Sequence, residues 1–161
     1  MDKITLKLTQ LTKTNFVFSA ILLCLVFSYI ISYAMHLFNP ETLDIDYLNN
    51  KSIPVKFILT VIVTPIIETL IYQYAIIEIV FRILKSNKTT IAILLSSVIF
   101  GLSHFYSITY ITATFILGLL FSCVYVIARK RNDVNPYWLL TVIHGSINLM
   151  AFIVNDLLPD L

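Results

Sequence analysis

Five long apolar segments set the strongest limit on how this chain of 161 residues folds. Each approaches or exceeds the roughly 20 residues that a helix needs to span the hydrocarbon core of a bilayer. Only 12% of the residues are charged, against about 25% in soluble domains, and the mean hydropathy is +0.89. Because lipid offers backbone groups no partner, and no strand-like alternation is present, the spans are predicted to be helices. We therefore predict an all-α, polytopic membrane bundle with about five transmembrane helices, at residues 15–38, 55–84, 89–105, 108–128 and 137–154.

The charges between the apolar segments predict the orientation of the bundle. Connections rich in lysine and arginine alternate along the chain with connections that are acidic or uncharged. The basic connections contain Lys3, Lys7, Lys13, Arg82, Lys85, Lys88, Arg129, Lys130 and Arg131. By the positive-inside rule, this alternation places the N-terminus in the cytoplasm. We expect a single membrane domain over residues 1–161, surrounded by lipid in a bacterial plasma membrane. The net charge of +2 gives no reason to expect a nucleic-acid partner.

Four polar residues inside or at the edge of the apolar segments are candidates for a functional site: Glu68, His104, His144 and Asn148. Ionisable groups are costly in the hydrocarbon region, so they usually face a protein interior or a water-filled cavity and mark a function. His144 and Asn148 are four residues apart, and a helix places such a pair on one face. Three separate helices therefore offer polar groups to one shared interior.

The depths of these residues disagree if the helices are straight. At 1.5 Å per residue, Glu68 lies roughly 21 Å and His104 roughly 24 Å from the cytoplasmic ends of their helices. By the same rise, His144 lies only roughly 10 Å along its own helix. Pro65 is expected to kink the second span just before Glu68, because it has no N–H for the carbonyl four residues back.

Two further patterns are interpreted as structural. Thr114, Gly118 and Ser122 are spaced four apart in the fourth segment, and such a stripe of small residues lets two membrane helices approach closely. Glu78 and Arg82 are also four apart, close to the predicted cytoplasmic boundary. We interpret them as an ion pair at the surface of one helix.

The order and spacing of the polar residues resemble a known family. Phe100-x-x-x-His104 and His144-x-x-x-Asn148 follow Glu68, each motif in its own apolar segment. This arrangement is similar to the CPBP family of intramembrane proteases, whose pattern is E-E-x-x-x-R, then F-x-x-x-H, then H-x-x-x-N. That family includes type II CAAX prenyl endopeptidases and bacteriocin-processing or immunity proteins.

The first motif departs from the family pattern at two positions. Thr69 stands in place of the second Glu and Gln73 in place of the Arg, within a resemblance that covers residues 55–155. A Glu and an Arg four residues apart would form an ion pair. Since both are replaced by neutral residues, no buried charge is left without a partner. We interpret Thr69, Gln73 and Phe100 as supporting residues of a compensated variant with a core of four spans.

The resemblance implies a hydrolase that cleaves a peptide or protein near the membrane. In the family, the first-motif Glu and the second-motif His activate a water molecule, and the third-motif His and Asn stabilise the oxyanion. Carried over, Glu68 becomes the general base and His104 helps to hold the water. His144 and Asn148 become the oxyanion donors.

A metal-dependent mechanism is the alternative. Glu68, His104 and His144 are adequate ligands for zinc, with water completing the site, and the family is often described as a metalloprotease family on that logic. However, the chain has no H-E-x-x-H motif, and the ligands would have to converge from three helices. We favour a mechanism without a metal and keep zinc as the alternative cofactor.

Other functions remain open beside protease activity. A non-catalytic relative, such as an immunity protein that binds a bacteriocin or its receptor, is the second expectation, because Thr69 and Gln73 vary the first motif. A small transporter or proton relay also uses intramembrane Glu and His, but the first and fourth spans offer no ionisable residue at mid-depth. A purely structural role, in which polar residues tie helices together, is the remaining alternative.

Overall fold

The computed structural model describes residues 8–38, 50–84 and 88–158, and within these ranges the chain is helical without any strand. The predicted fold class, an all-α membrane bundle, is therefore confirmed. In chain order the helices are α2 (Lys13–Phe38), α4 (Ile53–Phe57), η2 (Ile58–Val63), α5 (Thr64–Glu68), η3 (Thr69–Ala75), α6 (Ile76–Leu84), α7 (Thr89–Leu102), α8 (Ile108–Arg131), α9 (Pro136–Phe152) and η4 (Ile153–Leu157), where η marks a π-helix. The segments from α4 to α6 follow one another without a break, so they form one long helix of 32 residues.

Four helices of the described chain are long and apolar enough to cross a membrane. They are Lys13–Leu37, Ile53–Leu84, Ile108–Arg131 and Pro136–Leu157. The third predicted span, 89–105, is shorter in the structure because α7 ends at Leu102. A new helix begins soon afterwards, since the hydroxyl of Ser107 accepts a hydrogen bond from the Tyr110 amide and caps α8. The bundle therefore consists of four long helices and one short apolar helix.

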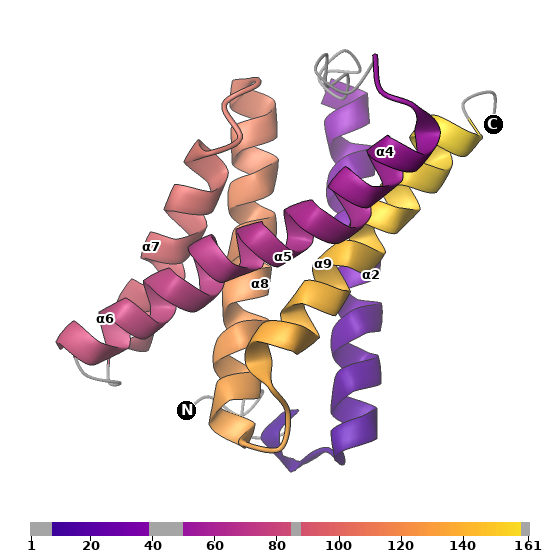
Figure 1. The fold of residues 1–161 in the computed structure, drawn as a ribbon. Helices are drawn as coiled ribbons and strands as arrows, with labels where there is room; N and C mark the ends of the chain where they lie inside the picture. The colour runs from indigo at the N-terminus through magenta and orange to yellow at the C-terminus, as the bar shows by residue number, and fades with distance from the viewer. Residues whose placement is uncertain (1–7, 39–49, 85–87, 159–161) are drawn as a thin grey trace.

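Helix α8 packs against elements from both halves of the chain. It contacts α2, α7, α9 and η3, and Figure 1 shows it upright behind the long helix. Gly118 lets α7 approach α8 closely, because a Cβ atom there would lie 3.0 Å from the Phe100 ring and 3.2 Å from the Cα of Ser97. The packing role predicted for the small-residue stripe of α8 is thus confirmed at its central glycine.

The long helix Ile53–Leu84 runs obliquely across the bundle (Figure 1). Its 32 residues extend about 48 Å, which exceeds the roughly 30 Å of the hydrocarbon core, and tilting accommodates the excess. Helix α9 is inclined as well and packs against η2, α5 and η3 (Figure 1). Distance along a helix is therefore no measure of depth here. This removes the disagreement that straight helices predicted for His144.

Pro65 lies between two π-helical stretches, η2 and η3. At the end of η2, the N–H of Thr64 donates to the carbonyl of Leu59, five residues back. By the same pattern, the carbonyl of Thr60 would need the N–H that Pro65 lacks. The side-chain amide of Asn148 donates to this carbonyl instead, over 2.8 Å. The proline expected to kink the helix thus leaves a backbone acceptor that a side chain of α9 satisfies.

The helix ends that carry basic residues gather at one end of the bundle. Figure 1 shows the start of α2, the end of α6 and the end of α8 toward that end, and the α7–α8 connection toward the other. At the basic end, the Arg131 guanidinium donates to the carbonyl oxygens of Leu8, Thr9 and Leu11 over 2.8–3.1 Å. The arrangement agrees with the alternation of charges along the sequence, and the cytoplasmic placement of the N-terminus stays a prediction.

Candidate active site

Glu68 lies between two imidazoles that come from distant parts of the chain. Its Oε1 is 3.7 Å from Nε2 of His104, and its Oε2 is 3.7 Å from Nε2 of His144. Glu68 is the last residue of α5, His104 follows the end of α7, and His144 lies in the middle of α9. The structure therefore joins three of the four candidate residues through one carboxylate.

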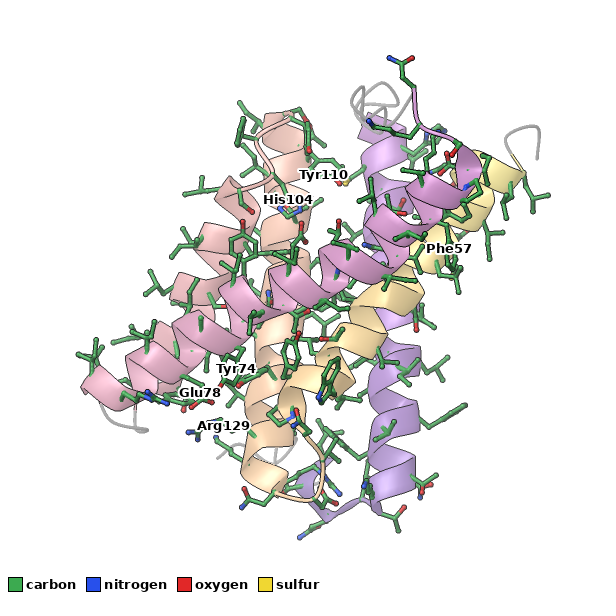
Figure 2. All side chains as sticks on the ribbon, viewed as in Figure 1. Phe57, Tyr74, Glu78, His104, Tyr110 and Arg129 are labelled. Carbon is green, nitrogen blue, oxygen red and sulfur yellow. The ribbon has the colours of Figure 1, made fainter. Side chains whose placement is uncertain are left out.

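The end of α7 orients the ring of His104. Its Nδ1 lies 2.8 Å from the carbonyl oxygen of Phe100 and 3.1 Å from Oγ of Ser103. A carbonyl only accepts, so Nδ1 carries the proton of the hydrogen bond. In the neutral form of the ring, Nε2 is then unprotonated, and its lone pair faces Glu68. The centroid of the Phe100 ring lies 4.7 Å from that of the imidazole, edge to face. The Tyr110 ring lies 5.9 Å from the imidazole, and Figure 2 shows Tyr110 beside His104.

His144 is almost completely buried between aromatic rings. Its ring centroid lies 5.0 Å from that of Phe121 and 6.1 Å from that of Phe100. The next residue, Gly145, lets α9 approach the long helix, because a Cβ atom there would lie 3.0 Å from the carbonyl oxygen of Val61. A larger residue would push α9 away from the helix that carries Glu68.

Asn148 lies one helical turn after His144, and its side-chain amide donates to the carbonyl of Thr60 rather than to Glu68. The amide nitrogen carries two N–H groups, so this bond leaves a second donor on the same nitrogen. Sequence analysis did not identify Thr60 as part of the site. The signal was Pro65, five residues later, which leaves the Thr60 carbonyl without a helical partner in a π-helix.

Two other contacts hold α9 against the long helix. The sequence did not predict either of them. Near its start, the Tyr137 hydroxyl donates to the carbonyl of Ile66 over 3.2 Å. Beyond its end, Asp156 pairs with Lys56 at 2.7 Å. The contact of Asn148 lies between these two, so α9 is held on both sides of His144.

The supporting residues of the first motif are fully buried. Thr69 and Gln73 are each 0% exposed, and Oγ1 of Thr69 and both amide atoms of Gln73 have no hydrogen-bond partner. Since neither Thr69 nor Gln73 is charged, neither of these two positions leaves an unpaired charge in the interior. Phe100, the third supporting residue, is buried at the contact with Gly118 and binds His104 through its carbonyl.

A second carboxylate of the long helix, Glu78, is bound in a different way. Arg129 donates from Nε to its Oε1 over 2.6 Å and from Nη2 to its Oε2 over 3.0 Å. The Tyr125 hydroxyl donates to Oε1 over 3.1 Å, and Figure 2 shows Glu78 and Arg129 facing each other. The interpretation of Glu78 and Arg82 as a surface pair is therefore corrected. Arg129 of α8 is the partner, because its planar guanidinium reaches both carboxylate oxygens at once.

The three side chains of the candidate site do not form a metal-binding group in this arrangement. Glu68, His104 and His144 have the donor atoms that zinc prefers, but zinc needs each donor about 2.0–2.2 Å from one point. Among the described residues, no three histidine, cysteine, aspartate or glutamate side chains are placed to hold one metal ion.

The fold and the site together define a polytopic helical membrane protein with a Glu/His centre enclosed between its helices. A family model described as type II CAAX prenyl endopeptidase Rce1-like matches residues 50–150. The chain belongs to this family, which is a family of intramembrane proteases within the CPBP group. The match includes all four candidate residues. Comparison with curated proteins and with solved structures gives no match.

Proposed function

We propose that the chain is an intramembrane endopeptidase that hydrolyses a peptide bond of a membrane-associated peptide or protein. The observation that supports this function best is the position of Glu68, 3.7 Å from Nε2 of both His104 and His144. At 3.7 Å, neither contact is a direct hydrogen bond. Both oxygens of the Glu68 carboxylate therefore remain able to accept hydrogen bonds from water or substrate.

The facing atoms of Glu68 and His104 suit the binding of a water molecule. The ionised carboxylate only accepts, and Nε2 of His104 also accepts, since Nδ1 carries the proton that binds the Phe100 carbonyl. Two acceptors at this separation do not bind each other, but a water molecule donates one hydrogen to each. The water oxygen is then left with its lone pairs free to attack a carbonyl carbon.

In the proposed reaction, Glu68 takes a proton from this water as the oxygen attacks the scissile carbonyl. The C=O electron pair moves to the oxygen, and N–H groups of His144 and Asn148 stabilise the resulting oxyanion. When the tetrahedral intermediate collapses, the C–N bond breaks and the proton held by Glu68 passes to the leaving amine. One water molecule is consumed, and no oxidant or reductant is needed.

The setting of the site indicates the kind of substrate. The four long apolar helices support an integral membrane protein, and the basic ends of its helices support an N-terminus in the cytoplasm. A substrate reaches the enclosed centre from the lipid or from the membrane surface. It is therefore a peptide or protein with a lipid anchor or an apolar segment.

A non-catalytic function is the second candidate, and the buried neutral pair Thr69 and Gln73 favours it. These positions carry charges in the family pattern that the chain resembles, and here both are neutral and enclosed. A protein of the bacteriocin-immunity type would bind its partner without hydrolysis, and substitutions at Glu68 would then leave its protective function intact.

The test is a cleavage assay on the purified full-length chain in proteoliposomes. A fluorogenic CAAX peptide, prenylated and unprenylated, is the probe. We expect hydrolysis by the native chain and loss of hydrolysis in Glu68→Gln and in His104→Ala. Glu78→Gln is the matched control, since Glu78 lies on the same helix and is bound by Arg129. Cleavage by Glu68→Gln at the native rate rejects the proposed roles.

The same assay tests the metal alternative. Treatment with a chelator, followed by metal analysis, is expected to leave the rate unchanged in a preparation free of zinc. Inactivation by the chelator, with recovery on adding zinc, rejects the mechanism without a metal.

A further inference from the structure

Buried polar atoms without a partner occur on two helices that pack against each other, η3 and α9. They are Oγ1 of Thr69, Oε1 and Nε2 of Gln73, Oγ1 of Thr141 and Nδ1 of His144. The first two residues belong to η3 and the last two to α9, and these helices pack against each other. No other buried side-chain polar atom of the described residues lacks a partner.

Hydroxyl groups elsewhere in the bundle behave differently. Thr60, Ser97, Thr112, Thr114 and Ser146 each donate to the carbonyl four residues back in their own helix, over 2.7–2.8 Å. This is the usual way in which a hydroxyl is satisfied inside a helix. The hydroxyls of Thr69 and Thr141 do not make this bond, although both side chains are enclosed.

The unpartnered atoms flank the candidate active site. Thr69 directly follows Glu68, and Gln73 lies one turn further along the same helix. Thr141 lies one turn before His144 on α9. The contact of 3.7 Å between Glu68 and His144 joins the two helices at this place. The unpartnered atoms therefore belong to His144 itself and to residues within about one turn of Glu68 and His144 on the two helices.

Such atoms are costly to bury unless something binds them. Buried polar groups are almost always hydrogen-bonded, and a group enclosed without a partner bears its full cost of desolvation. Where the protein supplies no partner, a buried water molecule that makes two to four hydrogen bonds takes its place. The five atoms include both donors and acceptors, so water is able to connect them.

We propose that the contact between η3 and α9 encloses ordered water bound by Thr69, Gln73 and Thr141, and that this water donates a hydrogen bond to Nδ1 of His144. A neutral imidazole has one protonated and one unprotonated nitrogen, and the partner of one nitrogen decides which form is present. A donor at Nδ1 keeps the proton on Nε2, which faces Glu68. Gln73 and Thr141 are then positioning residues that act on the active site through His144.

This inference deepens the proposed function, because an N–H on Nε2 of His144 is what the oxyanion requires. The water-binding site itself is independent of catalysis. It is therefore tested by measurements that need no substrate, and its failure does not decide whether the chain cleaves peptides.

The first test is the sign of the change in Tm when polar atoms are removed. Thr141→Val keeps the shape of the side chain and removes its hydroxyl, and Gln73→Leu removes the amide. If water binds these atoms, both variants have a lower Tm than the native chain, and Thr141→Ser keeps the native Tm. If the contact is dry, removing an unpaired polar atom raises Tm, and that result overturns the proposal. Thr112→Val is the control, since the Thr112 hydroxyl binds only its own helix.

The second test is the tautomer of His144, measured by NMR on the full-length chain labelled with ¹⁵N-histidine. The chain has three histidines, and the spectrum of His144→Gln identifies the signal. We expect the native His144 to show one protonated nitrogen, Nε2, and an unprotonated Nδ1. We expect Thr141→Val and Gln73→Leu to lose this single form, and Thr112→Val to keep it. A proton on Nδ1 in the native chain, or a spectrum that neither variant changes, overturns the proposal.

Discussion

Glu68 and Glu78 are two carboxylates on one helix with nearly the same exposure, 21% and 20% of their side chains, and with opposite surroundings. Glu78 receives two hydrogen bonds from Arg129 and one from Tyr125, all within 3.1 Å. Glu68 has two imidazole nitrogens at 3.7 Å and no direct hydrogen bond to either.

The difference teaches that burial alone does not identify a functional carboxylate in a membrane bundle. A carboxylate bound by an arginine through both oxygens is neutralised and orders the helices around it. A carboxylate beside neutral imidazoles keeps its oxygens available to water and substrate. The partner and its distance therefore separate a structural acid from a candidate catalytic acid.

The largest effect is expected from Glu68→Gln. The rate of peptide cleavage is expected to fall by roughly 10²- to 10⁴-fold, because the variant loses the general base. Its Tm is expected to stay near the native value, since Glu68 has no direct hydrogen bond to lose. Initial rates and Tm are measured on the same reconstituted preparation. If stability falls and the rate does not, Glu68 belongs with Glu78 as a structural acid.

A somewhat smaller effect is expected from Asn148→Ala, which removes a proposed oxyanion donor and the partner of the Thr60 carbonyl. We expect a rate loss of roughly 10²- to 10³-fold and a stability loss of about 1–3 kcal/mol. Denaturation in detergent and cleavage rates measure the two losses.

The variant Pro65→Ala separates the two roles of Asn148. It restores an N–H five residues after Thr60, so the double variant with Asn148→Ala is expected to regain stability without regaining activity. Recovery of both stability and activity in the double variant shows that Asn148 acts only as a contact between helices. Recovery of neither shows that the Thr60 carbonyl is not the group that Asn148 stabilises.

Glu78→Gln is expected to produce a moderate loss of stability and no change in the rate per folded molecule. Replacing the carboxylate weakens its bonds to Arg129 and Tyr125, for an expected loss of about 1–2 kcal/mol in this partly exposed setting. A double-mutant cycle with Arg129→Gln measures the coupling. A large fall in the cleavage rate of folded Glu78→Gln contradicts the distinction between the two acids.

The smallest effect on stability is expected at Asp133, which lies in the connection between α8 and α9 and forms an ion pair with Arg131. Arg131 donates to its carboxylate and so holds the pKa of Asp133 below its ordinary value. The stabilisation is therefore present above the pKa of the unfolded chain, near 3.8, and is lost as the pH falls through the lower folded value. Asp133→Asn is expected to remove only this acid-dependent part. Thermal melts at pH 7 and in acid, with and without added salt, measure it.

Much of the fold was predictable because a bilayer allows few solutions. The apolar segments, and the helical form of each, follow from length and hydropathy alone. The shortened α7 was not predictable, since an apolar run does not show that the helix gives way to a turn after Leu102. The oblique course of the long helix was not predictable either, because tilt depends on how helices pack.

The four candidate residues could be selected from the sequence, but the contacts between them could not, and their catalytic roles stay a prediction. The spacing of Phe100 with His104 and of His144 with Asn148 places each pair on one helix face. The sequence did not show that Asn148 binds the Thr60 carbonyl, although Pro65 marks the backbone group that lacks a partner. It also suggested Arg82 for Glu78, because neighbours along a helix are visible in a sequence and neighbours across helices are not.

The sequence by itself determined that the chain is a helical membrane bundle and that an acid, two imidazoles and an amide lie within it, because polar residues in apolar segments are few and costly. Only the tertiary structure decided which of these groups meet. The crossing of the helices brings Glu68 within 3.7 Å of His104 and His144. The packing of α8 against the long helix places Arg129 where it forms an ion pair with Glu78. The reason is physical: contacts between helices depend on tilt, on close approach at glycine and on freed backbone groups.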